Sequence, residues 1–251
     1  MKTKSLSETL LATFGAVLII LMLLAAGRGA TQSPPQGPAG GSSELQQRLA
    51  EVKQSAAQNK EALSHYTWQE EEKIAIKGDV KDTKIYQVRL GPDGKPEKQQ
   101  TENLPQSSGG RQHGLGHHIK EKKGEEYKEY GQQIGALAQQ YAQPDPERLQ
   151  QAFQQGNVML GSGGAPGEVK MVIKNYVKPN DQVTLIFSQQ AKAIQSLQIQ
   201  SYLTDPKDAV NIATQYSQLP DGTNHVSTMQ INGVSKNLMI TTQNSDYHKT
   251  M

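Results

Sequence analysis

The chain has 251 residues, a formal net charge of +2, a hydrophobic content of 35% and no cysteine. The small net charge gives no strong field for nucleic acid. The missing thiols exclude disulfide bonds, thiolate metal sites, a cysteine nucleophile and a lipid-modified N-terminal cysteine. The modest hydrophobic content favours a sheet with one solvent-exposed face over a sheet covered on both sides.

The first 30 residues have the pattern of an export signal, with basic residues at Lys2 and Lys4 and an apolar run from Leu10 to Ala26. The run is long for a signal peptide and slightly short for a membrane span. Cleavage of the signal and an uncleaved N-terminal anchor therefore both stay open. In either case we expect the rest of the chain to lie in the periplasm or at the outer face of the inner membrane.

A Pro-, Gly- and Ser-rich stretch at residues 31–43 predicts a flexible linker. A helix is expected from about Glu44 to Ser64, because Ser43 and Gln46 match a capping box and apolar residues then recur at helical spacing. From there to the C-terminus we expect a single domain, residues 44–251.

An alternating pattern from Trp68 to Ile76 predicts a strand, since successive strand residues point to opposite faces. Glu70 and Glu72 fall on the same side as Trp68, so we expect that side to be open or at an edge there. A second strand is expected at residues 82–90, followed by a hairpin turn in GPDGKP.

Residues 99–116 lack periodicity and predict a loop. A helical insertion is predicted at about 117–156, ending in a short helix with Asp145 as its N-cap and Gly156 in the left-handed position after it. The stripe of the long helix comprises Ile119, Tyr127, Tyr130, Ile134, Leu137 and Tyr141. Small residues beside the stripe predict close packing against another element, namely Gly131, Gly135, Ala138 and Ala142.

GSGGAPG at residues 161–167 is predicted to be a linker, because it lacks the Lys-Ser/Thr of a phosphate-binding loop. After it, apolar residues alternate in about six segments joined by turns too short for parallel crossovers, which predicts antiparallel neighbours. With about three strands before the insertion, the fold is expected to be α+β, with an antiparallel sheet of about nine strands and two to three helices.

The segment VTLIFSQQAKAIQSLQIQSYL resembles a recurring hairpin of the periplasmic lipoprotein-carrier superfamily (LolA/LolB-like), and LPDGTNHVSTMQI with KNLMITTQNSDY is similar to its closing strands. IKEKKGEEYKEY, PDPERLQ and DPKDAV are more closely similar to uncharacterised exported bacterial proteins. The resemblance covers roughly residues 44–250 and implies a LolA-like half-barrel, in which a strongly curved sheet wraps around helices and leaves an apolar cavity for acyl chains. The long helical insertion departs from the family.

The best candidate site is an apolar surface on one face of the predicted sheet. It would hold an acyl chain or another hydrophobic ligand if it is open, whereas the alternative is that the helices cover it as core. This predicted face comprises Trp68, Ile74, Ile76, Tyr86, Val88, Leu185, Phe187, Leu197, Ile199, Val210 and Ile212.

Histidines in RQHGLGHHIKEKK raise the question of a metal site, because His113 and His117 are four residues apart. Glycines between them argue against a shared helical face, so we expect these histidines and His118 to be solvated and to hold no metal. His225 is also expected at the surface. Paired carboxylates and nucleophile motifs are not evident, so we expect no enzyme and no cofactor.

These patterns predict a non-enzymatic exported protein, monomeric, that binds or carries a lipid, a lipoprotein or another hydrophobic ligand in the cell envelope. The alternative is a membrane-tethered structural or assembly factor of the envelope with a filled core. An open cavity of several hundred cubic ångströms lined by the predicted face favours the first, and filled packing favours the second.

Overall fold

The computed structural model describes residues 54–103, 115–142 and 145–250. The expected export signal, the linker and the first part of the first helix, residues 44–53, lie outside these ranges. Within the described residues, no helix is long and apolar enough to cross a membrane.

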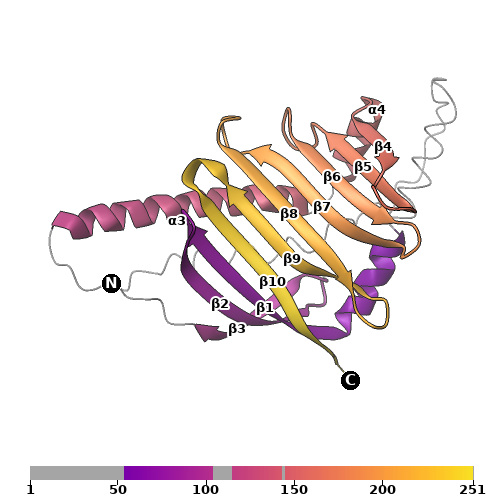
Figure 1. Ribbon diagram of the computed structural model, residues 1–251, viewed down its shortest axis with the longest axis horizontal. Coiled ribbons are helices and arrows are strands. Elements are labelled where there is room, and N and C mark those ends of the chain that lie inside the picture. The colour runs from indigo at the N-terminus through magenta and orange to yellow at the C-terminus, as the bar shows by residue number, and fades with distance from the viewer. Residues whose placement is uncertain (1–53, 104–114, 143–144, 251) are drawn as a thin grey trace.

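The described strands form one antiparallel sheet of ten strands in the order β3-β2-β1-β10-β9-β8-β7-β6-β5-β4 (Figure 1). Consecutive strands in the chain are neighbours in the sheet except β3 and β4, which lie at its opposite edges, and the last strand pairs with the first. There Ile74 lies opposite Ile240. The strands are β1 (Tyr66–Ile76), β2 (Asp79–Leu90), β3 (Pro96–Asn103), β4 (Val158–Ser162), β5 (Glu168–Lys174), β6 (Gln182–Ser188), β7 (Ala193–Tyr202), β8 (Ala209–Gln218), β9 (Asn224–Gly233) and β10 (Leu238–Lys249).

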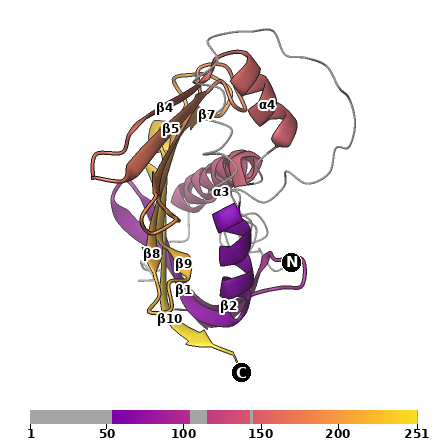
Figure 2. The same cartoon turned by 90° about the vertical axis from the view of Figure 1, so that its right-hand side faces the viewer.

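The sheet is curved, and the described helices lie on its concave side (Figure 2). They are a helix over residues 54–64, α3 (Leu115–Ala142) and α4 (Pro146–Gln154), with a short 3₁₀ turn, η1 (Val234–Lys236), between the last two strands. In β6 the residues facing the helices are buried and alternate with partly exposed ones. The predicted α+β class, antiparallel pairing and one exposed sheet face are therefore confirmed.

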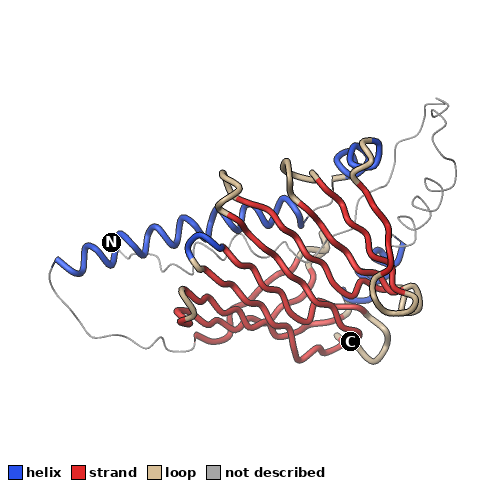
Figure 3. Tube along the Cα trace, turned by 45° about the horizontal axis from the view of Figure 1, so that its top comes forward, coloured by secondary structure: helices blue, strands red, loops and turns tan. Residues whose placement is uncertain are grey.

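The long helix α3 runs across several strands (Figure 3) and buries one stripe against them. Of the predicted stripe, Tyr130, Ile134, Leu137 and Tyr141 are buried in the main core, and Tyr127 is partly exposed. Ile119 lies where side chains are not described. The predicted small residues beside the stripe are buried as well, which confirms close approach to the sheet.

The short helix α4 begins and ends as its sequence predicts. Asp145 is the N-cap, and its carboxylate accepts hydrogen bonds from the backbone N–H groups of Glu147 and Arg148 at 2.9 and 3.3 Å. Gly156 follows with φ of +72°, a conformation that glycine adopts without steric cost.

The sheet has one strand more than the sequence patterns predict. The five-residue strand β4 ends inside the predicted glycine-rich linker, because Gly161 and Ser162 still pair with β5. Such a short edge strand has too few residues for an alternation to be visible. The loop expected at residues 99–116 is also wrong at both ends, since residues 99–103 belong to β3 and α3 begins at Leu115.

Candidate functional site

The structure brings the predicted face together on the concave side of the sheet. All of its residues are buried except Ile76, which is partly exposed and packs against the same core. Helix α3 covers most of the face, with Ile134 and Leu137 in the same apolar cluster as Leu197 and Val210. In this structure, side chains of the helices therefore cover the predicted face. Ligand binding at this face stays a prediction.

The face is divided into two apolar clusters, each beneath a different helix. Ile74 and the face residues of β6, β7 and β8 belong to the larger cluster under α3. Trp68, Tyr86 and Val88 belong to a smaller cluster with Leu63, a residue of helix 54–64. Both helices are needed to bury the concave side.

Charged side chains of β1, β2 and β3 separate the two clusters. Glu70 and Glu72 are only 3% and 4% exposed, so the expectation of an open side here is wrong. Lys98 pairs with Glu70 and lies 5.7 Å from the centre of the Tyr86 ring. A buried carboxylate is tolerated when a hydrogen-bonded cation compensates for lost water, and Lys98 of β3 supplies that cation here.

Burial raises the pKa of Glu72, and the nearby charge of Lys98 opposes that rise. The Tyr86 hydroxyl beside it is enclosed and has no hydrogen-bond partner among the described residues. A buried carboxyl group with a raised pKa is a common feature of acid–base sites. Neither of the two hollows described below is lined by Glu70 or Glu72, however.

His225 is buried rather than at the surface, with 8% of its area exposed. Its Nδ1 lies 3.1 Å from the carbonyl oxygen of Val226, and its ring is 4.2 Å from that of Tyr247. Burial lowers the pKa of the imidazole. The expectation of a surface position is wrong because Tyr247 of β10 packs against the histidine ring.

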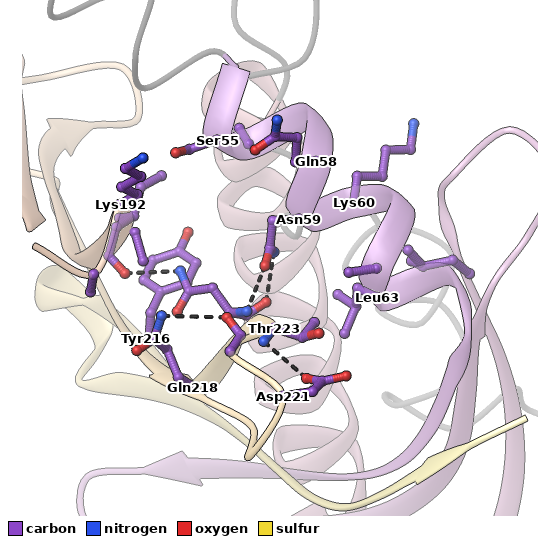
Figure 4. A pocket seen from close by; sticks show the side chains of 18 of the residues that line it. Ser55, Gln58, Asn59, Lys60, Leu63, Lys192, Tyr216, Gln218, Asp221 and Thr223 are labelled. Carbon is purple, nitrogen blue, oxygen red and sulfur yellow. Dashed lines mark hydrogen bonds between the residues drawn. The ribbon is translucent and has the colours of Figure 1, made fainter. Parts of the chain in front are cut away.

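A pocket of about 310 Å³ lies between helix 54–64 and the ends of β7, β8 and β9 (Figure 4). Its apolar lining comes from the helix, from β7 and β8, and from the end of β2, namely Ala56, Ala62, Leu63, Leu90, Ala193, Ile194 and Tyr216. Burial raises the pKa of Tyr216, so its phenol stays neutral. The pocket is amphipathic, since polar residues line the remainder.

The helix is held over the pocket by Asn59. Its side-chain amide donates to the carbonyl of Asn224 at 2.7 Å and accepts from the Asn224 N–H at 2.5 Å. The side chain of Asn224 in turn donates to the carbonyl of Ile194 at 3.0 Å. These three bonds fix one wall of the pocket to two strands.

The charges at the pocket are Lys60, Lys192 and Asp221. Asp221 accepts from the Tyr66 hydroxyl at 2.6 Å and from the Thr223 N–H at 3.0 Å. Lys249 lies 3.4 Å from it. The hydrogen bond from Tyr66, then those from Thr223, hold the pKa of Asp221 well below its usual range.

A second hollow of about 790 Å³ lies on the other side of the same helix, toward the β2–β3 turn. Ala57 and Glu61 of the helix and Arg89, Glu97 and Thr250 are among its lining residues. Its lining is richer in charge, and it is the weaker candidate for an apolar ligand.

Sequence reasoning missed the pocket residues Asn59, Lys192 and Asn224. They come from a helix, a turn and a strand start that are far apart in the chain, and no periodic pattern connects them. The sequence LPDGTN predicts a turn, but it does not predict that helix 54–64 packs against this turn. The prediction that the histidines of RQHGLGHHIKEKK hold no metal stays a prediction. His113 and the side chains of His117 and His118 lie outside the described part of the chain. Elsewhere in that part, no group of residues is arranged to hold a metal ion.

No family model matches this chain, and no curated protein matches it in sequence. Among solved structures, a distant match is the crystal structure of a DUF1329 family protein from Desulfovibrio piger. The two chains are 11% identical with a TM-score of 0.38, and the match covers 80% of this chain and 92% of the other.

Proposed function

We propose that this protein is a non-enzymatic exported protein of the cell envelope that binds a hydrophobic ligand in the pocket beneath helix 54–64. The observation that carries the proposal is the pocket itself, which has an apolar floor and a volume of about 310 Å³. That volume is at the lower end of the range for small-molecule sites. A pocket of this volume suits one small ligand or one acyl chain better than a multiply acylated protein.

The pocket is a better candidate than the predicted face because it is unfilled. At the predicted face, side chains of α3 and Leu63 already occupy the apolar surface. A ligand reaches those residues only if a helix moves away. The resemblance to lipoprotein carriers and the expected export signal support a location in the envelope. All of the pocket's described lining comes from one chain, so we propose a monomer.

Ligand extraction tests the proposal directly. We expect mass spectrometry of organic extracts from the purified full chain to detect an amphipathic or apolar molecule, and a fluorescent fatty-acid probe to bind. Ala56→Phe places a large ring in the pocket from the helix, so it should weaken probe binding by about tenfold or more. A protein that carries no extractable ligand and leaves the probe unchanged would overturn the proposal.

Ala57→Phe is the matched control, because Ala57 is on the same helix and lines the second hollow instead. It should leave probe binding intact. If Ala57→Phe rather than Ala56→Phe weakens binding, then the ligand occupies the second hollow and our placement is wrong.

A second candidate function is a membrane-tethered structural or assembly factor of the envelope. The filled packing of the predicted face supports it, since a scaffold needs a stable core and no internal cavity. N-terminal sequencing of the protein from its native membrane tests the tether. A mature chain that begins near residue 28 would remove it.

A further inference from the structure

We infer that the pocket beneath helix 54–64 selects single-chain amphiphiles with an anionic head group, and that Lys192 is the residue that binds this head group. The inference rests on the proposed function, because it names the ligand class of the same pocket.

The only carboxylate among the described lining residues is already engaged. Asp221 accepts hydrogen bonds from Tyr66 and Thr223 and has Lys249 as its counter-ion. It therefore has little charge left to attract a cationic ligand. Lys249 itself does not line the pocket.

The two lysines of the lining differ in their availability. The end of Lys60 lies over Gly94, and its Nζ is 3.4 Å from the carbonyl oxygen of Asp93, so the β2–β3 turn holds it. The side chain of Lys192 is exposed and has no hydrogen bond or ion pair within the described ranges. Figure 4 shows Lys192 on the opposite side of the pocket from helix 54–64.

The turn sets the backbone conformation at Lys192. This residue lies between β6 and β7 with φ of +49°, a conformation uncommon for a residue other than glycine, asparagine or aspartate. The next residues, Ala193 and Ile194, are buried and line the pocket floor. The backbone thus places a cation directly beside an apolar floor, which matches a carboxylate at the end of one alkyl chain.

Competition for photo-labelling tests the inference on the purified full chain. The probe is dodecanoate with a diazirine on its chain, and labelled residues are identified by mass spectrometry. Decanoate, decanol and decyltrimethylammonium are the competitors. We expect decanoate to compete about tenfold better than decanol, and the cation to compete worst.

Lys192→Glu should remove this preference and leave decanol competition unchanged. Lys207→Glu is the control, because it makes the same charge change at an exposed position in the turn between β7 and β8, at the other end of β7. If decanoate and decanol compete equally, or if Lys192→Glu keeps the preference, the inference is wrong and the pocket remains a ligand site. If no residue of the pocket is labelled at all, the proposed function fails as well.

Discussion

At the residue scale, the amide of Asn59 pairs with the backbone of Asn224 as a neighbouring strand residue would. The N–H and carbonyl groups of Asn224 are part-buried, and both depend on the Asn59 side chain for these hydrogen bonds. An unpaired buried backbone group costs roughly 1–3 kcal/mol. The contact between helix 54–64 and the sheet therefore depends strongly on this residue.

We predict that Asn59→Ala lowers the free energy of unfolding by about 1–3 kcal/mol, because the Asn224 N–H and carbonyl lose their partner. The gain in helix propensity from alanine is below about 1 kcal/mol and does not offset this loss. Denaturant unfolding measures the effect. Gln58→Ala, at an exposed position of the same helix, is the control and should change stability by no more than about 0.5 kcal/mol. Equal effects of the two variants would show that the pairing contributes nothing.

His225 makes stability depend on pH in a defined direction. Burial lowers its pKa in the folded state, whereas the unfolded chain has a histidine pKa of about 6.5. The unfolded state therefore binds the proton more readily. The stabilising contribution is complete above about pH 6.5 and is lost as the pH falls through that value toward the folded pKa.

We predict that His225→Gln flattens the dependence of unfolding free energy on pH below about 6.5, by up to about 1.4 kcal/mol per pH unit, the limit for one proton. Thermal unfolding at a series of pH values measures this slope. His248→Gln, whose side chain is exposed, is the comparison variant. A slope that is the same with and without His225 would contradict the assignment.

At the scale of elements, the packing of α3 onto the sheet depends on a glycine in the strand beneath it. A Cβ at Gly233 would lie 2.5 Å from Cδ1 of Ile134 and 2.6 Å from Cε1 of Tyr130. The φ angle of Gly233 is −87°, so the backbone conformation at this position would accept any residue. The glycine is required by the closeness of the helix and not by the conformation of the turn.

We predict that Ile134→Ala costs about 2–5 kcal/mol and Gly233→Ala about 1–3 kcal/mol, the first by leaving a cavity and the second by overpacking. The double variant should cost less than the sum, because the alanine at position 233 enters space that Ile134 vacates. A double-mutant cycle in denaturant measures this coupling. Gln133→Ala, at an exposed position of α3, is the control. Strictly additive effects of Ile134→Ala and Gly233→Ala would show that the two positions do not contact each other.

At the scale of the whole molecule, the described strands form an open sheet with an edge at β3, an edge at β4 and a well-covered middle. Strand β4 pairs only with β5, and β3 only with β2, whereas β9 pairs on both sides. Along β4, Gly163 donates to β5 and Asn157 accepts from it. Alternation then directs the N–H of Leu160 away from the sheet.

We predict that amide hydrogen exchange is slowest in β8 and β9 and much faster in β4 and β3, by at least about a hundredfold. Mass spectrometry of the exchanging full chain measures the ranking. Slow exchange at Leu160 would contradict the prediction, and it would show that something covers this edge.

Much of the fold was predictable because it depends on local patterns. The alternation in β6 and the stripe of α3 reflect the periods of a strand and a helix. The cap at Asp145 needs only its own neighbours in the chain. The missed strand β4 has too few residues to show a period, and the buried position of Glu70 depends on Lys98 from another strand.

The sequence by itself determined which segments become strands and helices, that neighbouring strands run antiparallel, and which side of the sheet is apolar. Only the tertiary structure decided that β10 pairs with β1, that α3 and Leu63 fill the predicted face, and that an unfilled pocket remains beneath helix 54–64. Local periodicity sets the first group. The second depends on contacts between residues far apart in the chain, which no single segment encodes.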